Sequence, residues 1–262
     1  MWGGKYYQNL GGNMPIQLNQ IEQAEYRYFI TIKTHLLCRI KEILKFLNSR
    51  IKILDDWKNQ FLATARRGYQ QSDLDIGAER VFHNFASLIF RNPNSTPIGS
   101  DIVFDSDEGY RIHIDIKTAL INNPADYNGK INIGKNQTSY SGTNFNGNLP
   151  TIYNGDGKIT LTYVIQIIHE HLSDKIHAII LASIPNGLLY EVYGDNIIKA
   201  GKGGWNKAKD FRFAYIIGKK VLKFRFNNED RVEIITLYKK TNILRNLGLK
   251  VNYEHDDNDL AI

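Results

Sequence analysis

Apolar residues recur every three or four positions from Leu18 to about Gly68, a spacing typical of amphipathic α-helices. Because this stretch of about fifty residues exceeds an ordinary globular helix, we expect two or three helices with a break near Asn48–Ser49. This N-terminal helical segment, residues 1–70, is expected to form either a helical layer on the core or an arm that packs against a second subunit.

The pattern then changes from a helical period to strict alternation. "SDLDIGAERVFHNFASLIFRN" predicts one more helix, because Ser72 and Asp75 resemble a capping signal and the apolar residues that follow form a single stripe. Beyond a loop with two prolines, "DIVF" and "YRIHIDIKT" flank the turn-like stretch "DSDEG". These two runs predict a β-hairpin.

The rest of the chain is rich in β-branched residues but less regular. Residues 122–158 are polar and predict a long loop, whereas "ITLTYVIQIIHEHL" fits either a helix or a strand. "KIHAIILASIPNGLLYEVYG" predicts a strand, an Asn-Gly turn and a returning strand. "KKVLKFRF" and "RVEIITLY" predict two more strands, "KKTNILRNLG" predicts a short helix, and the acidic tail "EHDDNDLAI" is expected to fray. The economical fold is one α/β (α+β) domain with a mixed sheet, whose core spans residues 71–262.

Composition narrows the classes of protein that fit. Cys38 is the only cysteine, which excludes an internal disulfide framework and a cysteine-based zinc cluster and favours a reducing compartment. No apolar run is long enough to predict a membrane span, and the first residues do not form a secretory signal. The net charge of +6 suits a polyanionic partner, because lysine and arginine neutralise phosphates.

Two aspartates and a lysine converge on the predicted hairpin. Residues two apart share one face of a strand, so Asp115 and Lys117 project together, and Asp101 opens the preceding strand beside them. Neighbouring carboxylates repel each other unless a cation lies between them, and a hard divalent cation such as Mg²⁺ prefers oxygen ligands. The three residues therefore predict a metal-dependent site with Asp101 and Asp115 as metal ligands. The alternative is a surface ion pair of little energetic value.

The series Ser100-Asp101, thirteen intervening residues and Asp115-Ile116-Lys117 resembles the PD-(D/E)xK nuclease superfamily, with Ser100 in place of the proline. "HIDIKTALINNPADYNGKINIGKNQTSYSG" is similar to the active-site region of type II restriction endonucleases of the EcoRV kind, and the likeness covers roughly residues 75–145. It implies a restriction-endonuclease-like mixed β-sheet core flanked by helices. It also makes Glu79, on the preceding helix, a candidate acidic residue of the catalytic site; the alternative is a solvated helix residue.

Two polar segments are candidates for contact with DNA. The first lies directly after the predicted catalytic strand and offers the side-chain types that read base edges: Lys135, Asn136, Gln137, Thr138, Ser139 and Tyr140. The second is the glycine-rich stretch "KAGKGGWNKAK", in which Lys202 and Lys207 would meet phosphates. The alternatives are a polar surface loop and a basic turn.

The resemblance implies a Mg²⁺-dependent type II restriction endonuclease that acts on double-stranded DNA as a homodimer in the cytoplasm of a prokaryote. Hydrolysis would leave 5′-phosphates. One rival is a nuclease of the same superfamily that serves repair or recombination, such as a junction resolvase. The other is a catalytically inactive DNA-binding module, which the presence of all three hairpin residues disfavours.

Overall fold

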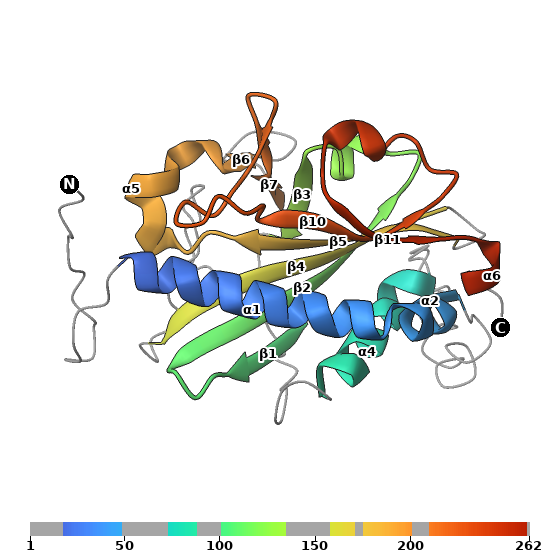
Figure 1. Ribbon diagram of the computed structural model, residues 1–262, viewed down its shortest axis with the longest axis horizontal. Coiled ribbons are helices and arrows are strands. Elements are labelled where there is room, and N and C mark those ends of the chain that lie inside the picture. Colours follow the sequence, from blue (N-terminus) through green and yellow to red (C-terminus); the bar gives the residue numbers. More distant parts are fainter. Residues whose placement is uncertain are drawn as a thin grey trace.

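A mixed six-stranded sheet forms the centre of the computed structural model (Figure 1). The structure describes residues 18–48, 73–87, 101–134, 158–170, 175–200 and 210–260. Along the sheet the strands are, in spatial order, β1 (Ile102–Asp105), β2 (Tyr110–Leu120), β4 (Ile159–His169), β5 (Ile176–Ile184), β10 (Val232–Tyr238) and β11 (Val251–His255). Strands β2 and β4 pair in parallel, as do β10 and β11, and the other neighbours are antiparallel. The mixed sheet flanked by helices is therefore confirmed.

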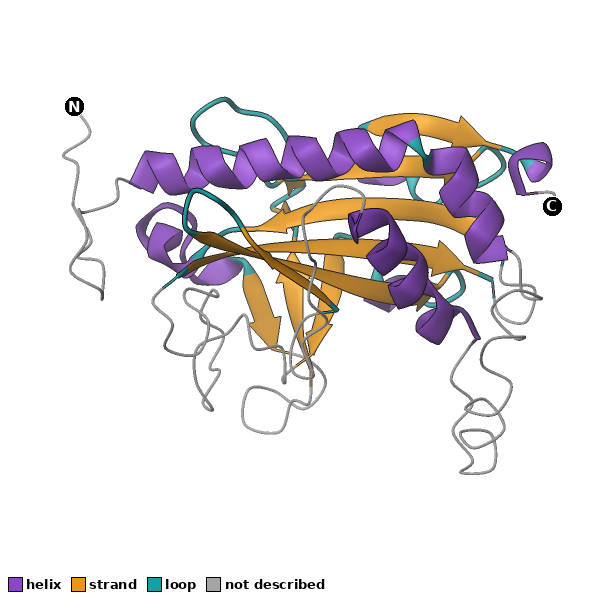
Figure 2. Cartoon of the chain, turned by 90° about the horizontal axis from the view of Figure 1, so that it is seen from below, coloured by secondary structure: helices purple, strands orange, loops and turns teal. Residues whose placement is uncertain are grey.

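Helices cover one face of this sheet. Helix α1 (Leu18–Cys38) lies across the strands and continues into α2 (Ile40–Asn48), while α4 (Asp73–Ser87) lies near β1 and β2 (Figures 1 and 2). The predicted break near Asn48 coincides with the end of α2, but a further break occurs at Arg39. A boundary between two parts near residue 70 falls outside the described residues and stays a prediction.

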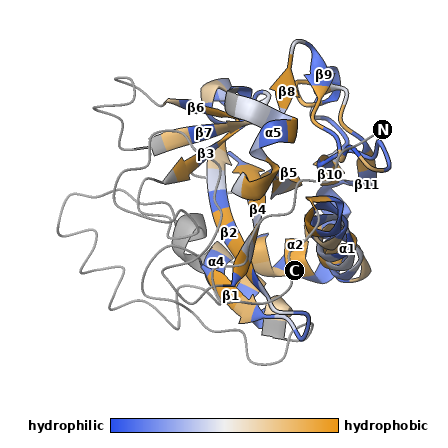
Figure 3. Cartoon of the chain, turned by 90° about the vertical axis from the view of Figure 1, so that its left-hand side faces the viewer, coloured by the Kyte–Doolittle hydropathy of each residue, from blue (hydrophilic) through white to orange (hydrophobic). Residues whose placement is uncertain are grey.

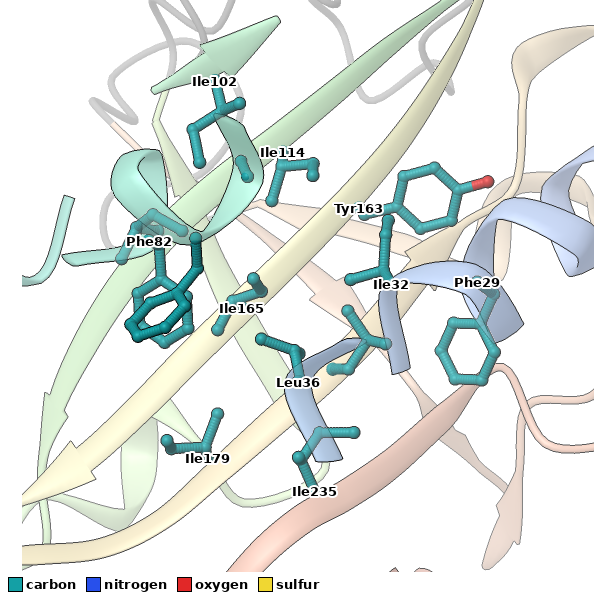
Figure 4. Close-up of a cluster of buried hydrophobic side chains, with 14 of the residues drawn as sticks. Phe29, Ile32, Leu36, Phe82, Ile102, Ile114, Tyr163, Ile165, Ile179 and Ile235 are labelled. Atoms are coloured by element: carbon teal, nitrogen blue, oxygen red, sulfur yellow. The ribbon is translucent and has the colours of Figure 1, made fainter. Parts of the chain in front are cut away.

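A continuous hydrophobic core joins these helices to the sheet (Figure 4). Phe29 and Leu36 of α1 and Phe82 of α4 pack with Ile114 of β2 and Ile165 of β4. The hairpin isoleucines point to this side because residues of even number on β2 share one face. In the described part of the N-terminal segment, α1 and α2 thus form a helical layer on the core.

A buried ion pair also fastens α1 to the sheet. The guanidinium of Arg231, which is 0% exposed, donates from Nη2 to Glu25 Oε2 at 2.6 Å and to Glu22 Oε1 at 3.1 Å. Arg231 also lies over the rings of Tyr193 and Phe224. A buried ion pair offsets the loss of hydration only when its donors and acceptors are well aligned. The pair therefore fixes the position of α1 on the strands.

A smaller sheet packs on the opposite face of the large one (Figure 3). Its spatial order is β3 (Lys130–Gly134), β7 (Asp210–Ala214) and β6 (Ile198–Ala200). Ile131 and Phe213 of this sheet pack against Val164 and Ile168 of β4, which makes a second core. Residues 122–158 were predicted to be a loop, but within their described part the short helical turn η1 (Pro124–Asp126) and strand β3 are regular.

The predicted strand after Asn186-Gly187 is wrong. The chain instead forms the helical turns η2 (Gly187–Leu189), α5 (Tyr190–Tyr193) and η3 (Gly194–Asn196). Asn186 keeps an extended backbone, with φ −63° and ψ 143°, and its side chain accepts a hydrogen bond from the Leu188 N–H. Its own N–H donates to Glu25 Oε1, and its Nδ2 donates to the Thr160 carbonyl. These tertiary bonds favour a helix cap over a hairpin turn.

Three predictions near the C-terminus need correction, although strand β10 is confirmed. "KKVLKFRF" contributes only β9 (Lys220–Val221), which pairs with β8 (Ile216–Ile217) through a turn at Gly218 and Lys219, both at positive φ. "KKTNILRNLG" contains only the short turn η4 (Arg245–Leu247), which does end at a left-handed glycine. The acidic tail is ordered through α6 (Asp257–Leu260), because Leu260 is buried and its carbonyl accepts a hydrogen bond from Asn48 Nδ2.

"ITLTYVIQIIHEHL", which fits either a helix or a strand by sequence, forms the buried strand β4. No helix among the described residues has both the length and the apolar character that crossing a membrane requires.

Candidate active site

The hairpin brings Asp101 beside Asp115. Ile102 of β1 is the partner of Ile114 on β2, so Asp101 stands opposite Asp115 at the end of the pairing. The Ile116 N–H donates a hydrogen bond to Asp101 Oδ2 at 2.5 Å. Burial raises the pKa of Asp101, while Lys117 and this hydrogen bond act in the opposite direction. The antiparallel register, which the alternating sequence predicted, thus fixes the position of this carboxylate.

Asp115 lies in the interior of the sheet, with a side chain that is 3% exposed. Its Oδ1 is 3.8 Å from Lys117 Nζ, and its Oδ2 has no hydrogen-bond partner among the described residues. Burial raises the pKa of Asp115 to about 7, against the attraction of Lys117 and with added repulsion from Asp101 and Glu79. A buried carboxylate oxygen without a donor is costly unless something else binds it.

Glu79 lies on the exposed side of α4, and its negative charge is among the causes of the raised pKa of Asp115. The helix therefore brings a third carboxylate within electrostatic reach of the pair. Among the described residues no group of three or more histidine, cysteine, aspartate or glutamate side chains is gathered closely enough to hold a metal. What the described residues show for Glu79 is the effect of its charge on Asp115.

One face of β2 and β4 is unusually polar for the middle of a sheet. It carries His113, Asp115 and Lys117 on β2, and in the parallel register Thr162 pairs with His113 and Gln166 pairs with Lys117. Burial lowers the pKa of His113 to about 3, so this imidazole is neutral at ordinary pH. Within the described chain, buried polar atoms on this face without a hydrogen-bond partner include Asp115 Oδ2, Thr160 Oγ1, Thr162 Oγ1 and Gln166 Oε1.

Sequence reasoning did not single out Gln166. The available signal was a lone amide inside the apolar run "YVIQII", but the run fits a helix as well as a strand, and its pairing with β2 is not visible locally. Only the register shows that this amide neighbours Lys117.

The donor set on the hairpin fits a hard divalent cation. Asp101 and Asp115 present carboxylate oxygens side by side, and the unsatisfied Oδ2 of Asp115 is the kind of ligand that such ions prefer. The predicted DNA-contacting residues Lys135, Asn136, Gln137, Thr138, Ser139, Tyr140, Lys202 and Lys207 lie outside the described residues.

Comparison with known families decides the class of protein. The model of the N-terminal domain of the type II restriction enzyme MwoI matches residues 17–174, and the model of the central domain of the same enzyme matches residues 176–238. The first match alone covers more than half of the chain. The chain belongs to the MwoI family of type II restriction enzymes. It is therefore a site-specific deoxyribonuclease, and the first match includes Glu79, Asp101, Asp115 and Lys117.

Two solved structures of restriction endonucleases are similar to the chain. The endonuclease BglI, bound to its DNA recognition sequence, is 20% identical over 82% of this chain and 94% of that chain, with a TM-score of 0.47. The tetrameric endonuclease SfiI, bound to cognate DNA, is 12% identical over 76% of this chain and 80% of that chain, with a TM-score of 0.49. The search of curated proteins finds no match.

Proposed function

We propose that this restriction endonuclease hydrolyses double-stranded DNA through a PD-(D/E)xK site that uses Mg²⁺ and leaves 5′-phosphates. The observation that carries the proposal is the placement of Asp101 against the Ile116 N–H, next to an Asp115 whose Oδ2 lacks a partner among the described residues. The likeness of the "IDIKT" strand to enzymes of the EcoRV kind supports the same assignment.

Each residue of the site has a separate role in the proposal. Asp101 and Asp115 hold the cation, which when bound would generate a hydroxide-like nucleophile and neutralise charge on the phosphoryl oxygen. Lys117 orients the attacking water and stabilises the negative charge that develops on the phosphate, because its ammonium lies at the edge of the carboxylate pair and is partly exposed. Glu79 adds negative charge that favours cation binding.

DNA contact and assembly complete the proposal. The polar segment from Lys135 to Tyr140 follows β3 and is assigned to base contacts, and Lys202 and Lys207 are assigned to phosphates. The enzyme acts as a homodimer, because two-fold protein symmetry matches a palindromic site. Its compartment is the cytoplasm. The N-terminal segment 1–70 is assigned to this dimer. One side of α1 packs on the core, and its exposed residues Asn19, Gln20 and Gln23 are the kind of surface that a second subunit could contact.

Digestion of a plasmid of known sequence tests the function. With Mg²⁺ the enzyme is expected to give discrete fragments, and sequencing their ends gives the recognition site, the stagger and the 5′-phosphate. Asp115→Ala is expected to abolish cleavage while DNA binding persists. Cleavage restricted to branched DNA would identify a resolvase-like nuclease instead, and binding without cleavage by the natural protein would identify an inactive module. An Asp115→Ala variant that cuts at the full rate contradicts the site assignment.

A further inference from the structure

Gln166 occupies a place in the sheet where an amide is costly. Its side chain is 1% exposed in the middle of β4, and in the parallel register it is the direct neighbour of Lys117. Adjacent strands lie about 4.8 Å apart, so side chains on the same face of paired residues reach each other. A buried amide lowers the stability of the fold unless its polar atoms are hydrogen-bonded. An amide at this position is therefore expected to have a functional role.

One half of the amide is already fixed. Gln166 Nε2 donates to the backbone carbonyl of Asp126 at 2.9 Å. This bond decides which end of the amide is nitrogen, because an oxygen facing a carbonyl oxygen would repel it. Gln166 Oε1 is therefore an acceptor held in a set direction, and it has no hydrogen-bond partner in the described part of the chain.

The residue that anchors the amide is itself hydrogen-bonded on two sides. Asp126 lies in the turn η1, and its carboxylate accepts hydrogen bonds from Asn123 Nδ2 at 2.6 Å and from Asn132 Nδ2 at 2.8 Å. The turn is thus tied both to its own start and to β3 of the small sheet. These contacts hold the Asp126 turn in place, and the bond from Nε2 to its carbonyl orients the Gln166 amide.

Lys117 supplies the matching donor. Its ammonium carries three N–H groups. Lys117 Nζ lies 3.8 Å from Asp115 Oδ1, close enough for an ion pair but too far for a hydrogen bond. We propose that Gln166 is a positioning residue, whose Oε1 accepts a hydrogen bond from the Lys117 ammonium in the complex with DNA and directs it toward the scissile phosphate. This inference rests on the proposed function and adds a residue to it.

Two substitutions separate positioning from packing. Gln166→Met keeps the length of the side chain but removes the acceptor and the N–H that bonds to Asp126, whereas Gln166→Glu keeps an acceptor oxygen and, as the neutral acid that burial favours, can donate its O–H to the Asp126 carbonyl. Thr162→Val is the matched control, because Thr162 is also buried on the same face of β4 with an unbonded side-chain oxygen among the described residues. Single-turnover cleavage, KM for DNA and the melting temperature are measured for all four proteins with the plasmid substrate and Mg²⁺.

The expected result is a loss confined to the chemical step. Gln166→Met lowers the cleavage rate about ten- to a hundredfold, the usual effect of losing one hydrogen bond to a charged group, while KM stays within about twofold. Gln166→Glu restores most of the rate, and Thr162→Val cuts like the natural protein.

Other outcomes overturn the inference. A Gln166→Met enzyme that cuts at the natural rate shows that the acceptor is not used. Equal losses in Gln166→Met and Gln166→Glu, in step with lower melting temperatures, show that Gln166 acts through packing. Both results leave the proposed function intact, since the natural protein still cuts. If the natural protein cuts no DNA, the proposed function fails and the inference fails with it.

Discussion

Asp101 accepts a hydrogen bond from the backbone N–H of Ile116, the residue that stands between Asp115 and Lys117 on β2. The carboxylate of one strand is thus held by the backbone of the next, at the point where the other two polar side chains of the site emerge. Strands hold side chains more precisely than loops do, so the arrangement is set before any ligand binds. Because the donor belongs to the backbone, substitutions of Asp115 or Lys117 are expected to keep this hydrogen bond to Asp101.

The buried carboxylate of Asp115 is expected to lower the stability of the metal-free enzyme. Burial raises its pKa to about 7 in the folded protein, whereas the ordinary value is 3.8. Between these values the folded state binds more protons than the unfolded state, so stability falls as pH rises and the loss is complete above about pH 7. Asp115→Asn is therefore expected to raise the free energy of unfolding at about pH 8 by a few kcal/mol and to change little below about pH 4.

Thermal unfolding with EDTA and with excess Mg²⁺ checks this prediction. Mg²⁺ is expected to raise the melting temperature of the natural protein at about pH 8, because a ligand that binds only the folded state stabilises it by mass action. The same addition should leave Asp115→Asn nearly unchanged. If Asp115→Asn is no more stable than the natural protein at alkaline pH, the carboxylate is not desolvated as described.

The variant Glu79→Gln tests whether Glu79 belongs to the site or is a solvated helix residue. Its charge raises the pKa of Asp115, so Glu79→Gln removes a repulsion that a cation would otherwise relieve. We expect this variant to need a severalfold higher Mg²⁺ concentration for half-maximal cleavage, because the site attracts the cation less. The control is Glu42→Gln, which changes an exposed glutamate on α2. If both variants have the same Mg²⁺ dependence as the natural protein, Glu79 is a solvated residue.

The parts of the site that the sequence predicted are those encoded by local pattern. The hairpin followed from alternation on both sides of a short turn, and alternation alone places Asp115 and Lys117 on one face. The neighbour of Lys117 did not follow, because β2 and β4 pair in parallel across a long intervening segment. Strand β4 is buried on both faces, so it lacks the alternation that would mark it as a strand. The position of Gln166 beside Lys117 therefore became evident only from the register of the two strands.

The errors in the fold have the same origin. Asn186-Gly187 has the local chemistry of a hairpin turn, yet Asn186 bonds to Glu25 and to Thr160, which are distant in sequence. The acidic tail reads as a frayed end, yet Leu260 is held by Asn48 of α2. In each case a tertiary contact overrides a correct local preference.

The last prediction concerns the attachment of α1. Arg231 is fully buried and donates hydrogen bonds to Glu22 and Glu25, so Arg231→Met leaves two carboxylates without their cation. Breaking one side of a buried pair usually costs about 3–5 kcal/mol, which urea denaturation would report as a lower free energy of unfolding. The control, Arg39→Met, removes an exposed partner of Glu42 and is expected to cost less than about 1 kcal/mol.

Cleavage by the remaining folded enzyme completes this test. Glu25 lies on α1, on the face of the sheet opposite to Asp115, so Arg231→Met is expected to keep the natural cleavage rate per folded molecule. Burial raises the pKa of Glu25 to about 7 even though Arg231 opposes the rise, so without Arg231 this carboxyl should take up a proton more readily. The destabilisation is then expected to be smaller at about pH 5 than at about pH 8, since the protonated acid carries no charge to bury. Equal and small losses for Arg231→Met and Arg39→Met would instead show that apolar packing alone holds α1 on the sheet.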